Sequence, residues 1–340
     1  MKKAVILFNL GGPDKLESVE PFLFNLFNDP AIISIPSILR YPLAKIISKR
    51  RAPIAKNIYR EIGNKSPILE LTQNQAKILE NYLSIKGEYK CFVVMRCWHP
   101  RASDVVKEVR KYNPDEIILL PLYPQYSAST SGSSIKEWND LCKKENYKIK
   151  TKTICCYPTE NNFLESHANL IKKTINNLKD KNFKLLFSAH GLPENKIKKG
   201  DPYQWQVEQT VQGIMSKLKD ENLDYTICYQ SRVGPLKWIG PSTDDVIVKY
   251  SKEKKGIIIV PVAFVSEHSE TLVELDIEYK KLAEKNGCSF YKRVPALATE
   301  ENFIKGLTEL VLQKETKGNY VSSIMCPDKY KKCPCLAIKS

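Results

Sequence analysis

The sequence lacks any apolar run long enough to cross a bilayer. Its longest nearly uninterrupted apolar stretches, residues 256–265 and 117–123, fall far short of the roughly twenty residues that a spanning helix needs. The N-terminal MKKAVILFNLGGP does not have the pattern of a signal peptide, because Asn9 and the following glycines interrupt its apolar run and no small-residue cleavage site follows it. We therefore expect a first strand over Ala4–Leu10 and a cytoplasmic protein.

Motifs for phosphate binding, covalent catalysis and disulfide frameworks are also missing. Gly11-Gly12-Pro13 has neither the G-x-G-x-x-G spacing nor the Lys-Ser/Thr of a phosphate loop, and no G-x-S-x-G elbow surrounds Ser188. The ten cysteines follow no regular pattern, with three of them in the last fifteen residues. Thiols or a metal site in a reducing cytosol fit this pattern better than disulfides. Nucleotide binding is not expected.

Acidic residues are scarce relative to basic ones, with 38 Asp and Glu against 53 Lys and Arg, for a net charge of +15. Such a charge suits nucleic acid, an acidic membrane surface or an anionic small molecule, and it cannot choose among them. Many lysines lie in surface-like stretches such as Lys196–Lys199 and Lys252–Lys255, so a general lysine bias explains much of the excess.

Short apolar strands alternate with longer amphipathic segments, which predicts βαβ units and parallel sheets. The strands fall into two comparable sets, and each strand ends at Gly or Pro: AVILFNLGGP, CFVVMRCWHP and IILLPLYPQYS, then LLFSAHGLP, ICYQSRVGP and IIIVPVAFVSEH. Residues 149–156 and 288–294 add a fourth strand to each set. The fold class is therefore α/β: two similar Rossmann-like domains, each a four-stranded parallel sheet flanked by helices, with an active-site cleft between them.

The expected domains are residues 1–160, with a lip at 26–53, then 161–315, with a final helix that can pack back on the first domain, and a cysteine-containing tail at 316–340. In doubly wound sheets ligands bind beyond the carboxyl ends of the strands. The loops expected there hold the unusual residues: Asn9–Pro13, Arg96–Pro100, Tyr123–Ser134, Ser188–Pro193, Gln230–Pro235 and Ser266–Glu270.

Glu270, Glu274 and Glu278 are spaced four apart directly after the strand at 256–265. On a helix this spacing stacks like charges on one face, which lowers stability unless a cation or protons pass along the row. A row facing a cleft is one interpretation. The other is a solvated helix face balanced by Lys280 and Lys281.

Histidine is rare, with four in the chain. His190 ends a predicted strand before Gly191, a favourable place for a ligand or base, and His268 lies beside the first acid in SEHSET. Either is by default a structural residue, and His167 and His99 have weaker cases. An imidazole with a carboxylate forms a site for a first-row divalent ion such as Fe²⁺, and the same pair can accept protons from a weakly acidic N–H.

The lip at 26–53 combines isoleucines and leucines with a basic end, Lys49, Arg50 and Arg51. This composition suits a surface that rests on anionic lipid or covers a flat apolar ligand carrying carboxylates. An ordinary buried helix with a solvated basic end explains it equally well.

Taken together, NLGGP, KRRAP, PLYPQYSASTSGSS, SAHGLPENKIKKGDPY, YQSRVGPLKWIGPST and PVAFVSEHSETLVELDIEY resemble ferrochelatases of the bacterial type, which insert ferrous iron into a porphyrin at the end of haem synthesis. The match runs in order from about Val5 to Leu310. The resemblance implies two similar Rossmann-like domains and a lyase acting on protoporphyrin IX, with Fe²⁺ as substrate. Leu10 resembles the protoporphyrin-using branch, because relatives that use coproporphyrin tend to carry Tyr in the corresponding loop.

Carried over residue by residue, the resemblance implies that His190 and Glu270 serve as metal ligand and proton acceptor, in an order left open. His268, Glu274 and Glu278 would form a path for protons or metal. The porphyrin-binding residues would be Leu10, Arg51, Tyr59, Ser66, Arg96, Tyr123, Trp238 and Phe264. Cys97 stands where many relatives carry Tyr, which removes the contact that tyrosine would make.

The tail cysteines Cys326, Cys333 and Cys335 resemble the end of those ferrochelatases that hold a [2Fe–2S] cluster, which needs four thiolates. Ala128 stands where animal relatives supply the fourth, so the ligand would come from Cys142, Cys155 or Cys156; a mobile tail of thiols is the alternative.

The expected partners are protoporphyrin IX and, peripherally, the inner-membrane surface, with no nucleic acid, for a monomer or homodimer. Three rivals remain open: a porphyrin or haem carrier without turnover, a coproporphyrin ferrochelatase, and a chelatase for cobalt or nickel.

Overall fold

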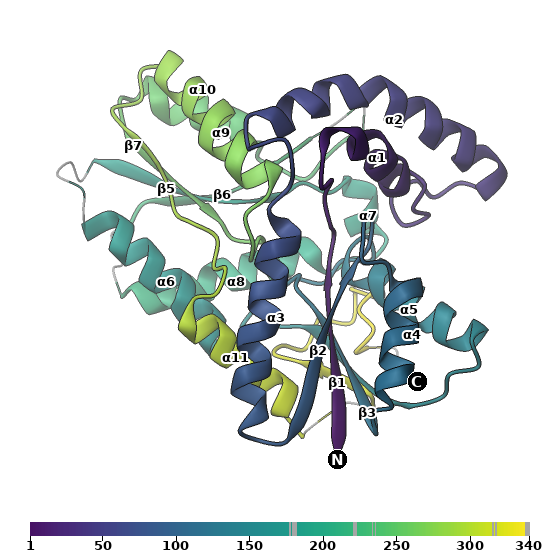
Figure 1. The fold of residues 1–340 in the computed structure, drawn as a ribbon. Coiled ribbons are helices and arrows are strands. Elements are labelled where there is room, and N and C mark those ends of the chain that lie inside the picture. Colours follow the sequence, from purple (N-terminus) through teal and green to yellow (C-terminus); the bar gives the residue numbers. More distant parts are fainter. Residues whose placement is uncertain are drawn as a thin grey trace. The chain divides into compact units, whose positions relative to one another are not determined.

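The structure, a computed structural model, consists of parallel β-sheets flanked by helices, and the predicted α/β class is confirmed (Figure 1). By its internal contacts the chain divides into two compact units, Met1–Cys156 with Leu307–Ser322, and Tyr157–Gly306 with Ser323–Ser340. The residues that the structure describes are 1–176, 178, 182–219, 223–232, 234, 236–314, 316 and 318–336.

The first unit holds a five-stranded parallel sheet in the order β2-β1-β3-β4-β9, which is one strand more than expected. The extra strand, Tyr320–Ser322, comes from the segment predicted as tail, and its three residues give a signal too short to detect. The elements are β1 Lys2–Asn9, η1 Leu16–Ser18, α1 Val19–Phe27, α2 Ser37–Arg60, α3 Ile68–Ser84, β2 Glu88–Met95, α4 Ala102–Tyr112, β3 Glu116–Pro121, α5 Ser131–Lys144, β4 Lys150–Cys156 and β9 Tyr320–Ser322.

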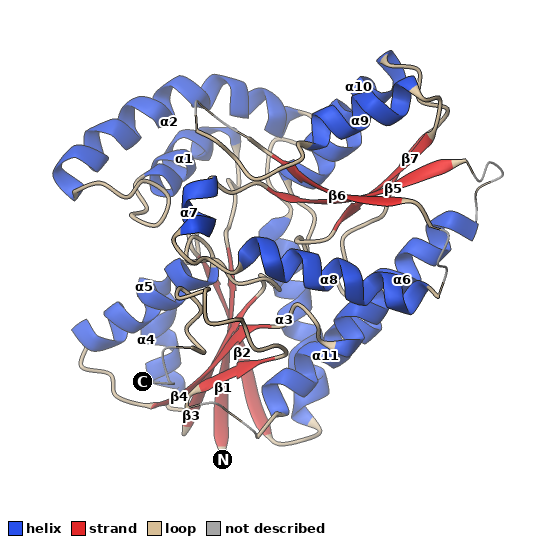
Figure 2. Cartoon of the chain, turned by 180° about the vertical axis from the view of Figure 1, so that it is seen from behind, coloured by secondary structure: helices blue, strands red, loops and turns tan. Residues whose placement is uncertain are grey.

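The second unit holds the expected four-stranded parallel sheet, in the order β6-β5-β7-β8 (Figure 2). Its elements are α6 Asn161–Asn176, β5 Phe183–His190, α7 Glu194–Lys198, α8 Tyr203–Leu218, β6 Tyr225–Gln230, α9 Thr243–Lys252, β7 Gly256–Pro261, the π-helix η2 Glu270–Glu278, α10 Tyr279–Lys285 and β8 Tyr291–Arg293. Helix α11, Glu301–Leu312, crosses from this unit into the first.

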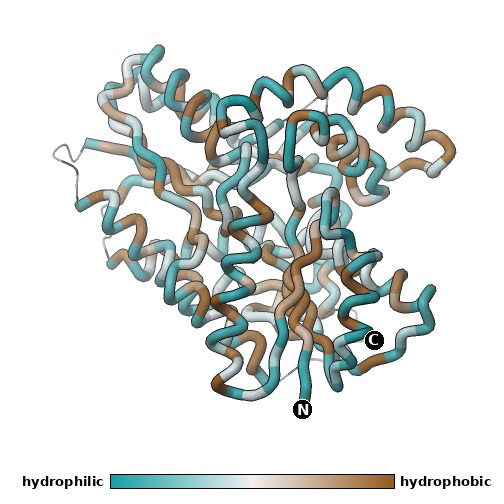
Figure 3. Tube along the Cα trace, in the orientation of Figure 1, coloured by the Kyte–Doolittle hydropathy of each residue, from teal (hydrophilic) through white to brown (hydrophobic). Residues whose placement is uncertain are grey.

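The two sheets repeat one topology, because in each the first strand lies between the second and the third. Their central strands are mainly apolar and largely buried, as expected of strands covered by helices on both faces. All six residues of β7 are buried, and hydrophobic colour runs along the strands of the first sheet in Figure 3. The duplication read from the sequence is therefore present in the fold.

Helices α9 and α10 cover one face of the second sheet. Val246 and Ile247 of α9 and Ala283 of α10 join the buried cluster that also contains Ile257 and Ile259 of β7. Figure 1 shows these two helices side by side, and this packing brings the first turn of α9 close to the end of η2.

Helix α2 differs from the expected stretch cut by prolines, since it runs without a break through Pro42 and Pro53. Proline removes one helical hydrogen bond and disfavours a helix interior. Here small buried residues, Ala44, Ser48 and Ala52, recur every four positions and keep the helix packed against α1. None of the helices in the described part of the chain is long and apolar enough to cross a bilayer.

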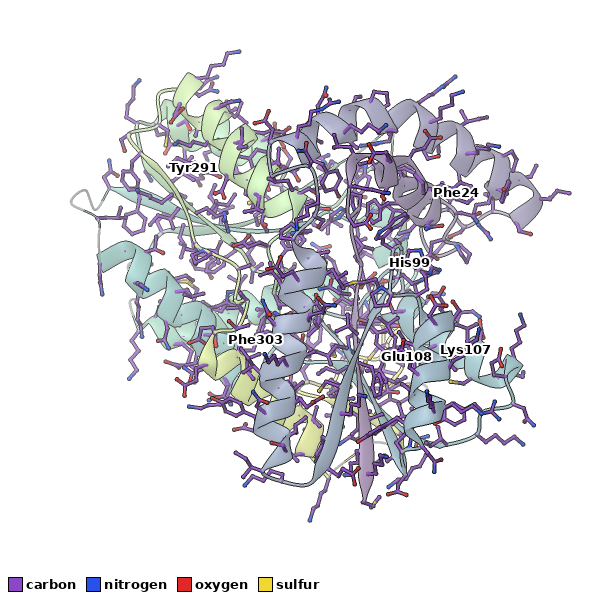
Figure 4. The ribbon with its side chains drawn as sticks, in the orientation of Figure 1. Phe24, His99, Lys107, Glu108, Tyr291 and Phe303 are labelled. Atoms are coloured by element: carbon purple, nitrogen blue, oxygen red, sulfur yellow. The ribbon has the colours of Figure 1, made fainter. Side chains whose placement is uncertain are left out.

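His167 of α6 is a buried polar group without a hydrogen-bonding partner among the described residues. It is 1% exposed, and neither ring nitrogen finds a donor or acceptor. Its ring meets Phe163 edge-on at 4.9 Å between centroids, and Phe163 in turn contacts Phe303, which is labelled in Figure 4. Burial lowers the pKa of His167 to about 3, so its imidazole is neutral in the folded protein.

This histidine predicts a loss of stability in mild acid. Between pH 6.5 and about 3 the unfolded chain binds a proton at His167 that the folded chain does not, so stability falls as the pH drops. The slope reaches about 1.4 kcal/mol per pH unit, so about 2 kcal/mol is lost between pH 6.5 and pH 5. In urea unfolding at pH 7 and pH 5, His167→Leu should lack this part of the loss.

His99 provides the control, because its side chain is 67% exposed. His99→Gln should keep the pH dependence of the unsubstituted protein. An identical acid loss in His167→Leu and in the parent would show that His167 does not produce it.

Candidate active site

His190 and Glu270 meet beyond the carboxyl ends of the second sheet. Strand β5 ends at His190, and the loop after β7 leads to Glu270 at the start of η2. Strand β5 lies between β6 and β7, so the connections that follow β5 and β7 run in opposite directions from this point. In doubly wound sheets, ligands bind at such a point. The His190 Nε2 and Glu270 Oε1 atoms are 3.8 Å apart.

The tautomer of His190 follows from its other nitrogen. Nδ1 lies 2.6 Å from the carbonyl oxygen of Gly191, and a carbonyl only accepts, so Nδ1 carries the proton. The lone pair of Nε2 then faces Glu270. At 3.8 Å the pair is too far apart for a direct hydrogen bond, so both atoms are available to a third group.

A second histidine lies near the other oxygen of the Glu270 carboxylate. His268 Nε2 is 4.0 Å from Glu270 Oε2, an atom that is buried without a hydrogen-bonding partner among the described residues. Burial lowers the pKa of His268, although the charges of Glu270 and Glu267 oppose the shift. The ring of Phe264 lies 4.7 Å from that of His268, so an aromatic wall flanks the imidazole.

Glu274 is held by four donor groups. Its two carboxylate oxygens accept hydrogen bonds from the Ser231 backbone N–H at 2.9 Å, the Ser231 hydroxyl at 2.5 Å, Gln230 Nε2 at 3.1 Å and the Tyr279 hydroxyl at 3.1 Å. Burial, and then the charge of Glu270, raise the pKa of Glu274. Glu274 is therefore a fixed carboxyl group suited to exchanging a proton.

The acids lie on a π-helix rather than on the ordinary helix that their spacing suggested. In η2 the hydrogen bonds run from i to i+5, a geometry that is rare and concentrates at functional sites. Glu270 and Glu274 are partly buried, whereas Glu278 is exposed. The row therefore does not have one environment along its length, and the path proposed through Glu278 stays a prediction.

Arg293 of β8 clamps the π-helix on both sides of its first acids. Its Nη1 lies 2.9 Å from Glu267 Oε1, while Nε and Nη2 bind the two oxygens of Asp276 at 2.7 and 2.8 Å. Although burial opposes it, the charge of Arg293 keeps the pKa of Glu267 low, and the backbone N–H of Ala296 adds a hydrogen bond. The loop before His268 is therefore anchored.

Trp238 lies against the turn that follows His190. A Cβ on Gly191 would stand 3.2 Å from Trp238 Cε3 and 3.0 Å from the Gln230 carbonyl oxygen, so glycine lets the two segments approach. Trp238 also forms a bridge with Pro193. Of the loop expected at Gln230–Pro235, Val233 and Pro235 lie outside the described residues.

Four predicted porphyrin contacts follow strands of the first unit or lie against their loops. Leu10 follows β1, and its carbonyl accepts from the Cys97 N–H at 2.8 Å. Tyr123 follows β3, and burial raises its pKa. The Ser66 N–H donates to the Pro13 carbonyl at 2.8 Å, next to NLGGP. Tyr59 is 6% exposed in a cluster that Leu10 also contacts.

Arg96 and Arg51 have different surroundings. Arg96 donates to Ser133 Oγ at 2.8 Å, to Glu137 at 3.2 Å and to Asp29 at 2.9 Å, so it holds a largely buried network together. Arg51 is exposed on α2. The roles proposed for the six candidates of the first unit stay predictions.

Sequence reasoning missed the residues that hold the acids in place. The sequence places Gln230 and Ser231 only in an expected loop and Arg293 only in an expected strand, and it gives Tyr279 no polar role. Their roles arise from contacts across at least 5 and at most 44 positions in sequence, which residue spacing does not reveal. Of these residues, only Gln230 has a signal in the sequence, because it ends a predicted strand next to a predicted base.

Solved structures with this fold include metal chelatases. SirB from Bacillus subtilis with Fe³⁺ matches with a TM-score of 0.52 and 13% identity over 92% of this chain and 95% of that one. The sirohydrochlorin chelatase SirB from Bacillus subtilis subspecies spizizenii, in complex with cobalt, gives 0.50 and 10% over 90% and 92%. At these identities the likeness concerns the fold, which is that of the two-sheet chelatases.

The sequence comparisons identify the family. The ferrochelatase family model matches residues 2–315. The ferrochelatase of Pelagibacter ubique is 66% identical over 99% of both chains, and that of Rickettsia felis is 50% identical over 98% of this chain and 99% of its own. This chain belongs to the ferrochelatase family. It is a metal chelatase enzyme that inserts iron into a porphyrin for haem synthesis.

The Arg293 clamp predicts a large effect of a single substitution on stability. Arg293→Met leaves the Glu267 carboxylate, whose side chain is 18% exposed, without its cation, so the free energy of unfolding should fall by about 3 kcal/mol. Lys280→Met breaks an exposed pair with Glu284 and should change it by less than about 0.5 kcal/mol. Equal stabilities of the two variants in denaturant unfolding would rule out the clamp.

Proposed function

We propose that the protein inserts Fe²⁺ into protoporphyrin IX and that His190 and Glu270 carry the reaction. The observation that supports this most directly is the approach of His190 Nε2 to Glu270 Oε1, at 3.8 Å, beyond the strand ends of the second sheet. Two ligand atoms this far apart can share one ion at about 2.1 Å from each. Imidazole and carboxylate together suit a first-row divalent ion.

The proposed reaction exchanges one Fe²⁺ for the two N–H protons of the porphyrin. A flat porphyrin shields its nitrogens, so binding energy from the ring edge that favours a saddled ring would expose their lone pairs and lower the barrier. His190 and Glu270 then divide metal binding and proton acceptance between them. His268, neutral and within 4.0 Å of Glu270, would pass on protons or metal.

Protoporphyrin rather than coproporphyrin is proposed from Leu10, which lies in a loop where coproporphyrin-using relatives tend to carry Tyr. Leu10 packs in an apolar cluster with Phe22 and Tyr59 in the first unit. An apolar side chain gives a coproporphyrin propionate no hydrogen bond, which favours the less polar porphyrin.

Membrane contact is proposed for α2. Ile38, Leu39, Ile46 and Ile54 are each at least 51% exposed, and hydrophobic stretches recur along this helix in Figure 3. Exposed apolar side chains on one helix, beside Lys45, Lys49, Arg50 and Arg51, are typical of a segment that rests on anionic lipid. A peripheral position would bring the enzyme to its poorly soluble substrate.

The tail stays outside the proposed mechanism. The alternative of a mobile tail is wrong for residues 323–336, because Trp205 stacks on Tyr330, Gln206 donates to Cys326 Sγ at 3.2 Å, and the Lys332 N–H bonds the Gly200 carbonyl at 3.0 Å. Cys326, Cys333 and Cys335 are buried thiols, one short of the four that a [2Fe–2S] cluster needs.

The other cysteines of the second unit do not complete that set. Cys228 lies in the sheet core, and the Cys288 thiol donates to the Phe290 carbonyl at 2.8 Å. This unit alone therefore does not fit a cluster, and a fourth thiolate would have to come from Cys142, Cys155 or Cys156. Of these, Cys142 packs against the core of the first unit.

Substitution of the central pair tests the proposed function. His190→Ala and Glu270→Gln should each lower kcat for anaerobic, Fe²⁺-dependent loss of protoporphyrin fluorescence by about 100-fold or more, because each removes a ligand or a base. Porphyrin binding, measured by fluorescence titration, should change by less than about threefold. His99→Ala, at an exposed site, is the control for loss of an imidazole.

Three results would contradict this proposal. Porphyrin binding without turnover by the unsubstituted protein would leave a carrier. Consumption of coproporphyrin alone would move the assignment to the other branch of the family. Unchanged kcat in both variants would separate this pair from the chemistry.

The membrane proposal predicts that α2 sets affinity for anionic vesicles. Replacing Ile38 and Ile46 by Gln removes two apolar side chains, each worth about 1.5–3 kcal/mol when buried, so partition into phosphatidylglycerol-containing vesicles should fall by about 100-fold or more. Ile85→Gln, at a position 81% exposed after α3, is the matched control. Equal co-sedimentation of the double variant and the control would exclude α2 as the contact.

A further inference from the structure

A hydrogen-bonded chain leads from the partly buried Glu274 to solvent without using the rest of the glutamate row. The Tyr279 hydroxyl lies 3.1 Å from Glu274 Oε1 and 3.3 Å from Asp244 Oδ2. Tyr279 is 4% exposed, whereas Asp244 is exposed in the first turn of α9. The three side chains therefore form a bridge from interior to surface.

The alternative route, along the row to Glu278, has no comparable link. Glu278 is exposed four positions beyond Glu274, and among the described residues no hydrogen bond joins the two. Proton transfer between side chains needs hydrogen-bond reach or one bridging water. Tyr279 meets this requirement on both of its sides.

We propose that protons displaced during metal insertion, once they are on Glu274, leave the site through Tyr279 and Asp244, with Tyr279 and Asp244 acting through Glu274 as positioning and relay residues. This inference rests on the proposed function of His190 and Glu270. It adds an exit that the spacing of the acids does not contain.

The transfer balances without any further reactant. A proton on the Glu274 carboxyl group passes to the Tyr279 oxygen while the Tyr279 hydroxyl proton passes to the Asp244 carboxylate, so the phenol is neutral before and after. Asp244 then gives its proton to bulk water. Burial beside two carboxylates raises the pKa of Tyr279, which keeps it a phenol that exchanges its proton.

The surroundings of Glu274 and Asp244, at the two ends of the hydrogen-bonded chain, suit proton transfer. Ser231 and Gln230 hold Glu274, and the Gln230 side-chain oxygen accepts from Ser188 Oγ at 2.7 Å, so the carboxyl group keeps one orientation toward Tyr279. At the other end, the N-terminus of α9 favours a negative charge in its first turn. Asp244 is exposed there, so its carboxylate is in contact with bulk water and can pass a proton to it.

Single-turnover insertion of Fe²⁺ into protoporphyrin IX by the full chain, under anaerobic conditions, tests the relay. Tyr279→Phe and Asp244→Asn should each slow insertion by about tenfold or more, with KM for porphyrin and for Fe²⁺ unchanged, because each blocks proton transfer without removing a ligand. Asp244→Glu restores a carboxylate and should recover most of the rate. A merely structural role would not distinguish Asn from Glu at an exposed position.

Tyr291→Phe is the matched control. It removes another phenol hydroxyl, partly buried beside the π-helix, which donates to the Leu275 carbonyl at 2.6 Å, and it should keep the parent rate. Figure 4 labels Tyr291. If Tyr279→Phe lowers the melting temperature, the two variants of the exposed Asp244 still test the relay.

Failure of the relay and failure of the proposed function give different results. Parent rates in Tyr279→Phe and Asp244→Asn, with Glu270→Gln inactive, overturn the relay alone. A slow Tyr279→Phe with a normal Asp244→Asn also overturns it, since Tyr279 would then only hold Glu274. An active Glu270→Gln removes the proposed function itself.

Discussion

The order of the strands is the constraint on which the candidate site depends. In the second sheet β5 lies between β6 and β7, so the chain leaves β5 toward one side and arrives at β7 on the other. The carboxyl ends of β5 and β7 are therefore neighbours whose following loops diverge. His190 ends one of these strands, and Glu270 begins the helix after the other, so the topology itself brings an imidazole and a carboxylate 3.8 Å apart.

Holding several carboxylates close together requires groups that offset their negative charge. The fold uses few cations for this purpose. Arg293 is placed on Glu267 and Asp276, which flank the reactive acids, rather than on Glu270 or Glu274. Glu274 receives neutral donors from Gln230, Ser231 and Tyr279 instead. Because a cation on Glu274 would hold its pKa low, neutral donors combined with burial allow this carboxyl group to take up and release a proton.

The sequence predicted the elements that carry a strong local signal. Apolar strands ending at Gly or Pro predicted the two parallel sheets, and the family motifs led to the pair His190 and Glu270. The π-helix was not predictable, because spacings of four read as an ordinary helix until the hydrogen bonds are known. Strand β9 was missed for its three residues, and Arg293 because its partners lie 17 and 26 positions away. Local patterns gave elements and candidates, whereas long-range contacts decided which candidates are supported.

The repeated topology shows that the two halves of the chain have diverged in chemistry rather than in architecture. At the position in the first sheet that corresponds to His190, β1 ends at Asn9, whose amide donates to Thr72 and whose side-chain oxygen accepts from the Leu10 N–H. After β3, where the second sheet leads to Glu270, the first sheet presents Tyr123. The first switch point thus carries amide, apolar and aromatic groups, and the second carries an imidazole and carboxylates, the groups proposed to bind metal and accept protons. The two sheet edges thus share a topology but present different side chains, which is why the proposed chemistry is assigned to the second sheet alone.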